Sequence, residues 1–366
     1  MGSHMTTRRD LLVAGAAISL LGASRASAQP SSLDAALAGT LAAGGVPALA
    51  GMIVGPDTVL WTGAAGVRRK GGVEEATVDD RWHLGSNTKA MTAALYGRLV
   101  DQGRATWGAR IADLLPVPAL APEWREVTIE AVLSHTGGLS DATAMGQAWL
   151  MTARDDPRSL TDQRAALAQA MLATAPAGPA GTFAYANANY VLVGAVIERI
   201  TGLSWESAVM AEVFEPLGIT SGGFGAPLGD QPWGHRGGVG VDPASPASDN
   251  PLAMGPAATA SMTLSDYARL LRALMATGDG WLTSETRAAL TRALGSGAPA
   301  YGGGWLIVEG QPWARGPALT HDGSNTLWYV SAWLAPATGR AFVAVSNDGA
   351  GAASCQRLIG QMIASV

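Results

Sequence analysis

Strand-like runs lie at both ends of this 366-residue chain and helical runs fill the middle, and this arrangement constrains the fold more than any other feature. Near the N-terminus two β-like runs, 46–54 and 58–63, meet at Gly55-Pro56-Asp57, which predicts a hairpin. Three more strand-like runs follow near the C-terminus, at 304–308, 327–334 and 341–346. We therefore predict an α/β fold whose antiparallel sheet is built from both chain ends, with flanking helices and a helical lobe.

Apolar residues at helical spacing mark most of the remaining chain. The helical runs are 32–43, 88–102, 129–134, 160–173, 189–201, 204–217, 264–275, 284–294 and 352–363. A chain of this length is long for one compact core. We expect a discontinuous α/β domain from residues 29–105 and 255–366, and a mainly helical domain from residues 106–254.

One long segment, residues 221–259, shows neither the helical nor the strand periodicity of apolar residues, and it is rich in Gly, Pro, Asp and Ser. A loop of this length in a compact chain is either functional or mobile. We expect it to border an active-site cleft, with Trp233 supplying an apolar contact to the substrate. The alternative is a surface excursion that Trp233 pins to the body of the protein.

Residues 1–28 are predicted to be a tag remnant followed by an export signal. The opening Met1-Gly-Ser-His-Met5 reads as the scar of a cleaved affinity tag. The pair Arg8-Arg9, the short apolar stretch 11–22 and a small-residue cleavage site near Ala28 are typical of a twin-arginine signal. No stretch is long enough to span a bilayer. We expect an exported protein, periplasmic or secreted; an ordinary N-terminal helix is the alternative.

The composition is that of a globular protein, with 48% apolar and 14% charged residues. The formal charge of −5 argues against nucleic acid as a partner. The single cysteine, Cys355, excludes an internal disulfide and falls in a helical run, where we expect it to be buried. Among 24 basic residues only Lys70 and Lys89 are lysines. Lysine, unlike arginine, can release its proton, so both positions need an explanation. Lys70 lies in a glycine-rich turn and is interpreted as a solvated turn residue.

The sequence Ser86-Asn87-Thr88-Lys89 opens a helical run. Residues three apart share a helix face, so the lysine amine can reach the serine hydroxyl. A serine hydroxyl is a weak nucleophile until a base takes its proton, and a lysine in a suitable environment can be that base. The alternative is a serine helix cap followed by a surface lysine.

A second motif, Tyr185-Ala186-Asn187, precedes the helical run at 189–201. A phenol near a lysine can carry protons, and an amide side chain can hold a substrate carbonyl. Taken alone, these residues are better explained as a buried tyrosine beside a helix-capping asparagine.

The pattern His-x-Gly occurs three times, beginning at His135, His235 and His321. Only His321 follows Tyr185 in the chain and leads into a strand-like run, whose edge could present a backbone N–H to a substrate. His135 precedes Gly137-Gly138 and is interpreted as a helix stop and turn.

Taken together, these motifs and their order resemble the class C β-lactamase superfamily, which includes family VIII carboxylesterases, D-Ala-D-Ala carboxypeptidases and D-aminopeptidases. The stretches 133–139 and 301–305 match the same group, and the likeness runs from about Leu33 to the C-terminus. The resemblance implies a β-lactamase/transpeptidase-like fold and an acyl-enzyme. It implies these roles: Ser86 as nucleophile, Lys89 and Tyr185 as proton carriers, the N–H groups of Ser86 and Ser324 as oxyanion hole, and Asn187 as the group that orients the acyl side chain. We further expect substrate contacts from His321, Gly323, Trp233 and Trp305.

The resemblance fixes the type of reaction and leaves the substrate open. We expect a small-molecule ester or amide substrate, no metal and no cofactor. Enzymes that hydrolyse β-lactams usually carry Lys-Thr-Gly at the third motif, whereas this chain has His321-Asp322-Gly323. Histidine is only partly charged near neutral pH, and a carboxylate at Asp322 would repel an anionic substrate. A carboxylesterase is therefore the leading hypothesis. The alternatives are a D-amino-acid-type peptidase or amidase, a β-lactamase, and a penicillin-binding sensor that is acylated without turnover.

Overall fold

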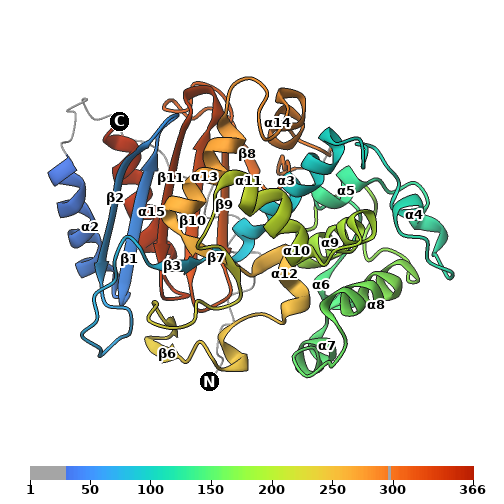
Figure 1. Cartoon of the computed structure of the whole chain (residues 1–366), viewed down its shortest axis with the longest axis horizontal. Coiled ribbons are helices and arrows are strands. Elements are labelled where there is room, and N and C mark those ends of the chain that lie inside the picture. Colours follow the sequence, from blue (N-terminus) through green and yellow to red (C-terminus); the bar gives the residue numbers. More distant parts are fainter. Residues whose placement is uncertain (1–29, 296–297) are drawn as a thin grey trace.

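The computed structural model describes residues 30–295 and 298–366 (Figure 1). A six-stranded antiparallel sheet has the order β2-β1-β11-β10-β9-β8. Its strands are β1 (Ala48–Val54), β2 (Val59–Gly66), β8 (Leu306–Val308), β9 (Ala318–Ser324), β10 (Tyr329–Ala335) and β11 (Arg340–Ser346). The predicted α/β fold, with one antiparallel sheet from both chain ends, is confirmed.

Alternating side chains along the central strands divide the core into two layers. On one face of the sheet, α2 (Pro30–Gly44) and α15 (Ala352–Ala364) pack against Leu49, Ile53 and Phe342. This layer also holds Cys355, which is buried as predicted. On the other face, α13 (Leu264–Met275) packs against β1, β10 and β11, and the larger core continues from there into the helical part.

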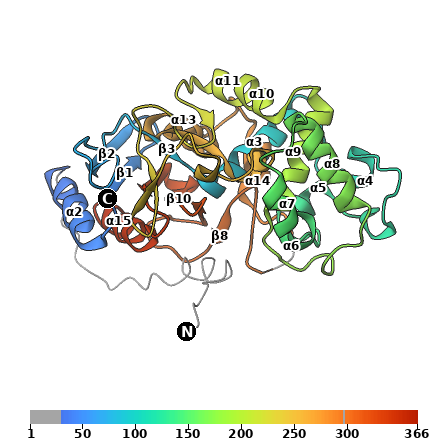
Figure 2. The ribbon, with the colours of Figure 1, turned by 90° about the horizontal axis from the view of Figure 1, so that it is seen from below.

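Most helices gather at the end of the molecule opposite α2, as both views show (Figures 1 and 2). They are α4 (Ile111–Leu114), α5 (Ile129–Leu133), α6 (Asp141–Ala144), α7 (Gln147–Thr152), α8 (Leu160–Leu172), α9 (Asn187–Thr201), α10 (Trp205–Val209) and α11 (Glu215–Leu217). Between this group and the sheet lies α3 (Thr88–Asp101), which contacts α9, α12 (Gly255–Ala258) and α14 (Ser284–Thr291). Because α3 is buried on nearly all sides, its first turn is held from several directions.

Two sequence predictions need correction. Residues 318–324 were not predicted as a strand, yet they form β9, and His321 is therefore inside a strand and not only ahead of one. The run 204–217 is not one α-helix, because a π-helical turn, Met210–Phe214, separates α10 from α11. Pro216 has no N–H to continue the regular hydrogen-bond pattern, which accounts for the break.

The segment 221–259 is more ordered than its composition indicates. It holds β4 (Gly223–Phe224), which joins β3 (Arg81–His83) and β7 (Ala260–Thr263) in a small sheet, and the hairpin of β5 (Gly234–Arg236) with β6 (Val239–Val241). These strands have two to four residues each and are too short to give a sequence period.

The predicted tag remnant and export signal, residues 1–28, lie outside the described residues, and export stays a prediction. Within the described part of the chain, no helix has the length and apolar character needed to cross a membrane.

Candidate active site

The predicted nucleophile, Ser86, lies in a 3-10 turn, Gly85–Asn87, directly before α3. Gly85 has φ +50°, and a Cβ there would lie 2.4 Å from the Ser324 amide nitrogen, so only glycine fits. The neighbouring Asn87 holds the turn in place: its amide donates to the His321 carbonyl at 3.3 Å, and it accepts from the Tyr267 hydroxyl at 2.9 Å. Asn87 is therefore a structural residue of the site, a role that its place inside the Ser86–Lys89 motif did not indicate.

The lysine amine reaches the serine as the three-residue spacing predicted. Lys89 Nζ lies 3.1 Å from Ser86 Oγ, 2.8 Å from Asn187 Oδ1 and 2.9 Å from the Ala257 carbonyl oxygen. The Lys89 side chain is fully buried. The amine therefore has a fixed position beside the nucleophile, which excludes the alternative of a surface lysine.

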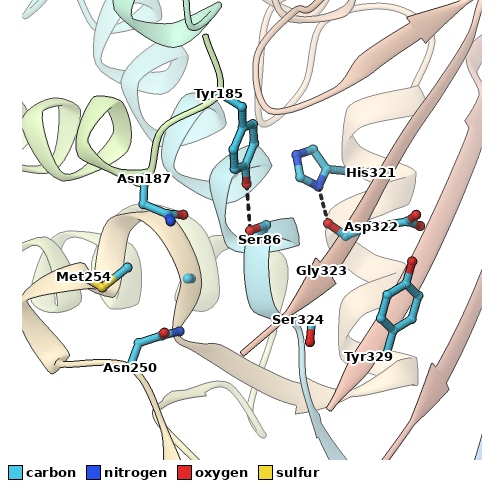
Figure 3. A pocket seen from close by; sticks show the side chains of 11 residues that line it. Ser86, Tyr185, Asn187, Asn250, Met254, His321, Asp322, Gly323, Ser324 and Tyr329 are labelled. Atoms are coloured by element: carbon cyan, nitrogen blue, oxygen red, sulfur yellow. Dashed lines mark hydrogen bonds between the residues drawn. The ribbon is translucent and has the colours of Figure 1, made fainter. Parts of the chain in front are cut away.

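The phenol of Tyr185 completes the group around the nucleophile (Figure 3). Its oxygen lies 2.8 Å from Ser86 Oγ, and Lys89 Nζ lies 4.9 Å from the centre of its ring. Two potential proton carriers thus contact one hydroxyl from different elements, Lys89 from α3 and Tyr185 from the segment before α9.

Asn187, the first residue of α9, is oriented from two sides. Its Oδ1 accepts from Lys89, and its Nδ2 donates to Asp141 Oδ2 at 2.9 Å. The other carboxylate oxygen of Asp141 accepts from the Ala188 N–H at 2.9 Å, at the N-terminus of α9, where a negative charge is stabilised. Sequence reasoning missed Asp141 because 46 residues separate it from Asn187.

The third motif lies on β9. His321 Nδ1 donates to the Asp322 carbonyl oxygen at 2.7 Å, and burial together with the charge of Lys89 lowers the pKa of His321 to about 3. The imidazole is therefore neutral at physiological pH, which sharpens the sequence expectation of partial charge. At Gly323 a Cβ would lie 2.9 Å from the Ser86 amide nitrogen. Glycine is required there so that β9 can approach the nucleophile turn.

The Asp322 side chain turns away from Ser86 toward Tyr329 (Figure 3). Asp322 pairs with Ser331 on β10. Tyr329 and Trp333, two residues before and after Ser331 on the same face of that strand, belong to the core layer covered by α15, so the Asp322 side chain points into this layer. Burial raises the pKa of the Asp322 carboxyl, and interactions with the Ser331 and Tyr329 hydroxyls oppose that rise.

An open cavity of about 640 Å³ lies over the nucleophile. Its lining residues are Ser86, Tyr185, Asn187, Asn250, Met254, Ala258, His321, Asp322, Gly323, Ser324 and Tyr329. Three of them belong to the segment 221–259, so this segment borders the cavity. In the described part of the chain, no group of three or more His, Cys, Asp or Glu side chains is arranged to hold a metal ion.

The structure does not bring the two predicted tryptophans to the cavity. Trp233 packs against the guanidinium of Arg69, 4.1 Å from its ring centre, and its backbone N–H donates to the Arg68 carbonyl at 2.9 Å. Trp233 thus pins the segment 221–259 to the body, as in the alternative interpretation. Trp305 is 1% exposed and belongs to the core around α3.

His135 proves more than a helix stop. It is fully buried with φ +60°, and its ring centre lies 4.5 Å from that of Tyr185. His135 Nδ1 lies 3.3 Å from the Ala186 nitrogen and 3.0 Å from Asn189 Nδ2, so it holds the chain that carries Tyr185. Burial, with the charge of Lys89, keeps its pKa well below the usual value.

The fold and this group of side chains define an enzyme of the active-serine acyl-transfer class. The serine hydroxyl is flanked by a lysine and a tyrosine, and Ser86 and Ser324 both line the cavity. The family model described as "Beta-lactamase" matches residues 33–361, and the chain belongs to this family of serine hydrolases.

Similar proteins cover different activities. The chain is 30% identical to a penicillin-binding protein 4 of Amycolatopsis lactamdurans, over 78% of this chain and 77% of that protein. It is 32% identical to esterase EstB of Burkholderia gladioli, over 45% of this chain and 44% of that protein. The octameric penicillin-binding protein homologue from Pyrococcus abyssi has a similar fold, with a TM-score of 0.74 and 20% identity over 92% of this chain and 78% of that one. The predicted superfamily is therefore confirmed, while the particular substrate is not determined at these identities.

Proposed function

We propose that this enzyme hydrolyses uncharged carboxylic esters through an acyl-enzyme on Ser86. The observation that carries this proposal is the electrostatic character of the cavity. Its described lining holds no arginine or lysine, and its single histidine, His321, is neutral because burial and Lys89 lower its pKa to about 3. A substrate carboxylate would find no counterion among these lining residues, because the nearby Lys89 amine is buried and already donates to Asn187 and the Ala257 carbonyl. An unpaired charge in a partly desolvated site is unfavourable.

The reaction follows from the contacts around the nucleophile. Ser86 Oγ attacks the ester carbonyl carbon while its proton passes to the neutral amine of Lys89 or to Tyr185 as phenolate, which both lie within hydrogen-bond distance. The negative charge that develops on the carbonyl oxygen is stabilised by the N–H groups of Ser86 and Ser324. The C–O bond to the alcohol then breaks, the alcohol takes the proton, and water releases the acid from Ser86 by the same steps. An esterase occurs among the relatives, which supports this substrate class.

A substrate panel tests the proposal. Neutral p-nitrophenyl esters of several acyl lengths should turn over, and each should be faster than the matching p-nitrophenyl hemisuccinate by about tenfold or more in kcat/KM, because the latter brings an unpaired carboxylate. A chromogenic cephalosporin and D-alanyl p-nitroanilide represent the β-lactamase and peptidase alternatives. Faster hydrolysis of either than of every ester would refute the proposal, and one burst of product without turnover would indicate the sensor.

A variant of the nucleophile provides the matching control. Ser86→Ala should abolish hydrolysis and leave the circular dichroism spectrum unchanged, because it removes one partly exposed hydroxyl. Intact-protein mass spectrometry with a fluorophosphonate should find one adduct on the wild type and none on the variant. An adduct that persists in Ser86→Ala, or that maps to Ser324, would overturn the assignment of the nucleophile.

A further inference from the structure

A buried aspartate outside the group of residues so far described, Asp249, joins the two backbone segments that meet over the nucleophile. Its side chain is 8% exposed, and its two carboxylate oxygens contact different elements. One oxygen contacts His83, at the end of β3 just before the nucleophile turn, and the other contacts Asn325, just after β9.

The contact on the nucleophile side ends one residue before Ser86. His83 Nε2 lies 2.9 Å from Asp249 Oδ2, and His83 Nδ1 lies 3.1 Å from the Gly85 nitrogen. The Gly85 N–H must donate, so Nδ1 accepts and Nε2 carries the proton that is donated to Asp249. The ring stacks on Trp328 at 5.6 Å, which fixes its plane. Asp249 thus sets the position of Gly85 through one imidazole.

The contact on the strand side ends one residue after Ser324. Asn325 Nδ2 donates to Asp249 Oδ1 at 2.9 Å, and Asn325 Oδ1 accepts from the N–H groups of Leu327 and Trp328 at 3.1 Å each. The amide therefore holds the β9–β10 turn closed, and Asp249 fixes where that turn lies relative to the nucleophile.

The aspartate itself is anchored from the helical part of the molecule. Arg154, which follows α7, donates from Nη2 to the Asp249 carbonyl oxygen at 2.6 Å, and the next residue, Asn250, lines the cavity. Asp249 therefore connects three separate elements at the edge of the site, two through its carboxylate and the third through its backbone carbonyl.

We propose that Asp249 is a positioning residue for the oxyanion hole, acting through His83 and Asn325 to set the spacing between the Ser86 and Ser324 N–H groups. The two glycines at this junction, Gly85 and Gly323, let the segments approach but exert no force to keep them together. Asn87 holds the turn to β9 at the His321 carbonyl, and Asp249 adds a second constraint at the Ser324 end of the strand. The inference rests on acyl transfer at Ser86 and not on the substrate being an ester.

The expected effect is on the rate of acylation and not on substrate binding. Oxyanion donors contribute in the transition state, so a misplaced donor lowers kcat and leaves KM nearly unchanged. Removing one donor outright lowers kcat by about 10²–10³-fold. We expect a displaced donor to cost about 10- to 100-fold, in line with the sensitivity of catalysis to small misplacements.

The first variant is Asp249→Asn, whose single acceptor oxygen can face either His83 or the side that receives Asn325 Nδ2 and the Asn250 N–H. We expect kcat on the best substrate to fall about 10- to 100-fold with KM within about twofold of wild type, and fluorophosphonate labelling to slow in parallel. Asp266→Asn is the matched control. The Asp266 carboxylate accepts from Thr220 and Ser221, where the segment 221–259 begins, and these contacts involve neither the nucleophile turn nor β9. It should lower thermal stability and leave kcat unchanged. A folded Asp249→Asn enzyme with wild-type kcat would overturn the proposal, as would equal losses of kcat in both variants.

A paired exchange gives a second test that does not depend on the first variant being stable. Asn325→Asp keeps the acceptor for Leu327 and Trp328 but brings a second carboxylate against Asp249, so kcat should fall. In the double variant D249N/N325D, the amide introduced at position 249 can donate to the new carboxylate and still accept from His83, while the Asn250 N–H loses its acceptor, so the recovery is partial. We expect a higher kcat in the double variant than in Asn325→Asp. If the losses of kcat in the two single variants simply add in the double variant, the proposed coupling between Asp249 and Asn325 is refuted. The rate of fluorophosphonate labelling also depends on the oxyanion hole and needs no ester substrate. Labelling rates of these variants therefore test the role of Asp249 even if the proposed ester substrate is wrong.

Discussion

Replacing Lys89 by arginine is the sharpest test of the proton transfer that the site implies. Arginine keeps the positive charge and nearly the length of lysine but stays protonated in proteins. If Lys89 takes the proton of Ser86 across the 3.1 Å that separates them, it must be neutral for part of the cycle. Lys89→Arg should then be nearly as inactive as Lys89→Ala.

The size of the loss follows from the role. General-base contributions are about 10²–10⁴-fold in kcat/KM. This range corresponds to about 2.7–5.4 kcal/mol of transition-state stabilisation. The fully buried amine makes two further contacts, to Asn187 and to the Ala257 carbonyl, so part of the loss in either variant reflects a displaced Asn187.

Chemical rescue separates proton transfer from crowding by the larger side chain. In Lys89→Ala, small primary amines should restore activity in proportion to the concentration of unprotonated amine, and guanidine should not. Lys70→Arg is the control, because Lys70 is exposed and contacts His235 only through its backbone N–H. Kinetics on one good ester decide the question. A Lys89→Arg enzyme within a few-fold of wild type would refute the reasoning and leave Tyr185 as the proton acceptor.

Two further predictions concern stability and the cavity wall. Burial lowers the pKa of His135 and His321 in the folded protein, whereas in the unfolded chain both histidines titrate near pH 6.5. Below about pH 6.5 the unfolded chain therefore binds more protons than the folded protein. The free energy of unfolding should be full above this pH and should fall below it by up to about 1.4 kcal/mol per pH unit for each histidine. Urea unfolding at pH 7 and 5.5 should give a smaller loss for His321→Gln than for wild type, and an equal loss would contradict the assignment. Met254 lines the cavity and Trp233 does not, so Met254→Ala should shift the preference toward longer acyl chains by about threefold or more, while Trp233→Ala leaves the ranking of p-nitrophenyl esters unchanged. A changed ranking in Trp233→Ala would restore the sequence hypothesis for that residue.

Features set by local periodicity could be predicted from the sequence. The helix 264–275 has the predicted bounds, and the spacing of Ser86 and Lys89 correctly predicted their contact. Both depend on neighbours along the chain, where the helical repeat decides which side chains meet. Local spacing alone does not predict the fold. The order of the three motifs, and the family resemblance that it indicates, predicted the fold.

Features set by contacts between distant segments could not be predicted. The strand β9 was missed because His321 and Asp322 interrupt its apolar run, and only pairing with β8 and β10 makes it a strand. Asp249 contacts His83 across 166 residues of sequence, so no local sequence pattern predicts this contact. Trp233 was assigned to the substrate from its place in a long loop, yet its packing partner is Arg69.

The histidine of the third motif changes what the cavity can bind without changing the chemistry at the serine. Three basic groups, those of Lys89, His135 and His321, are buried close together, and the charge of Lys89 lowers the pKa of both histidines. Close buried bases cannot all hold protons, since each added charge opposes the next. The histidines therefore act as neutral hydrogen-bonding and packing groups. A proton leaving Ser86 passes to Lys89 when that amine is neutral, or to Tyr185 as phenolate. A strand lysine in place of His321 would add a cation to the cavity and attract a carboxylate. The neutral imidazole removes that attraction, which is why the same serine, lysine and tyrosine are expected here to act on uncharged esters.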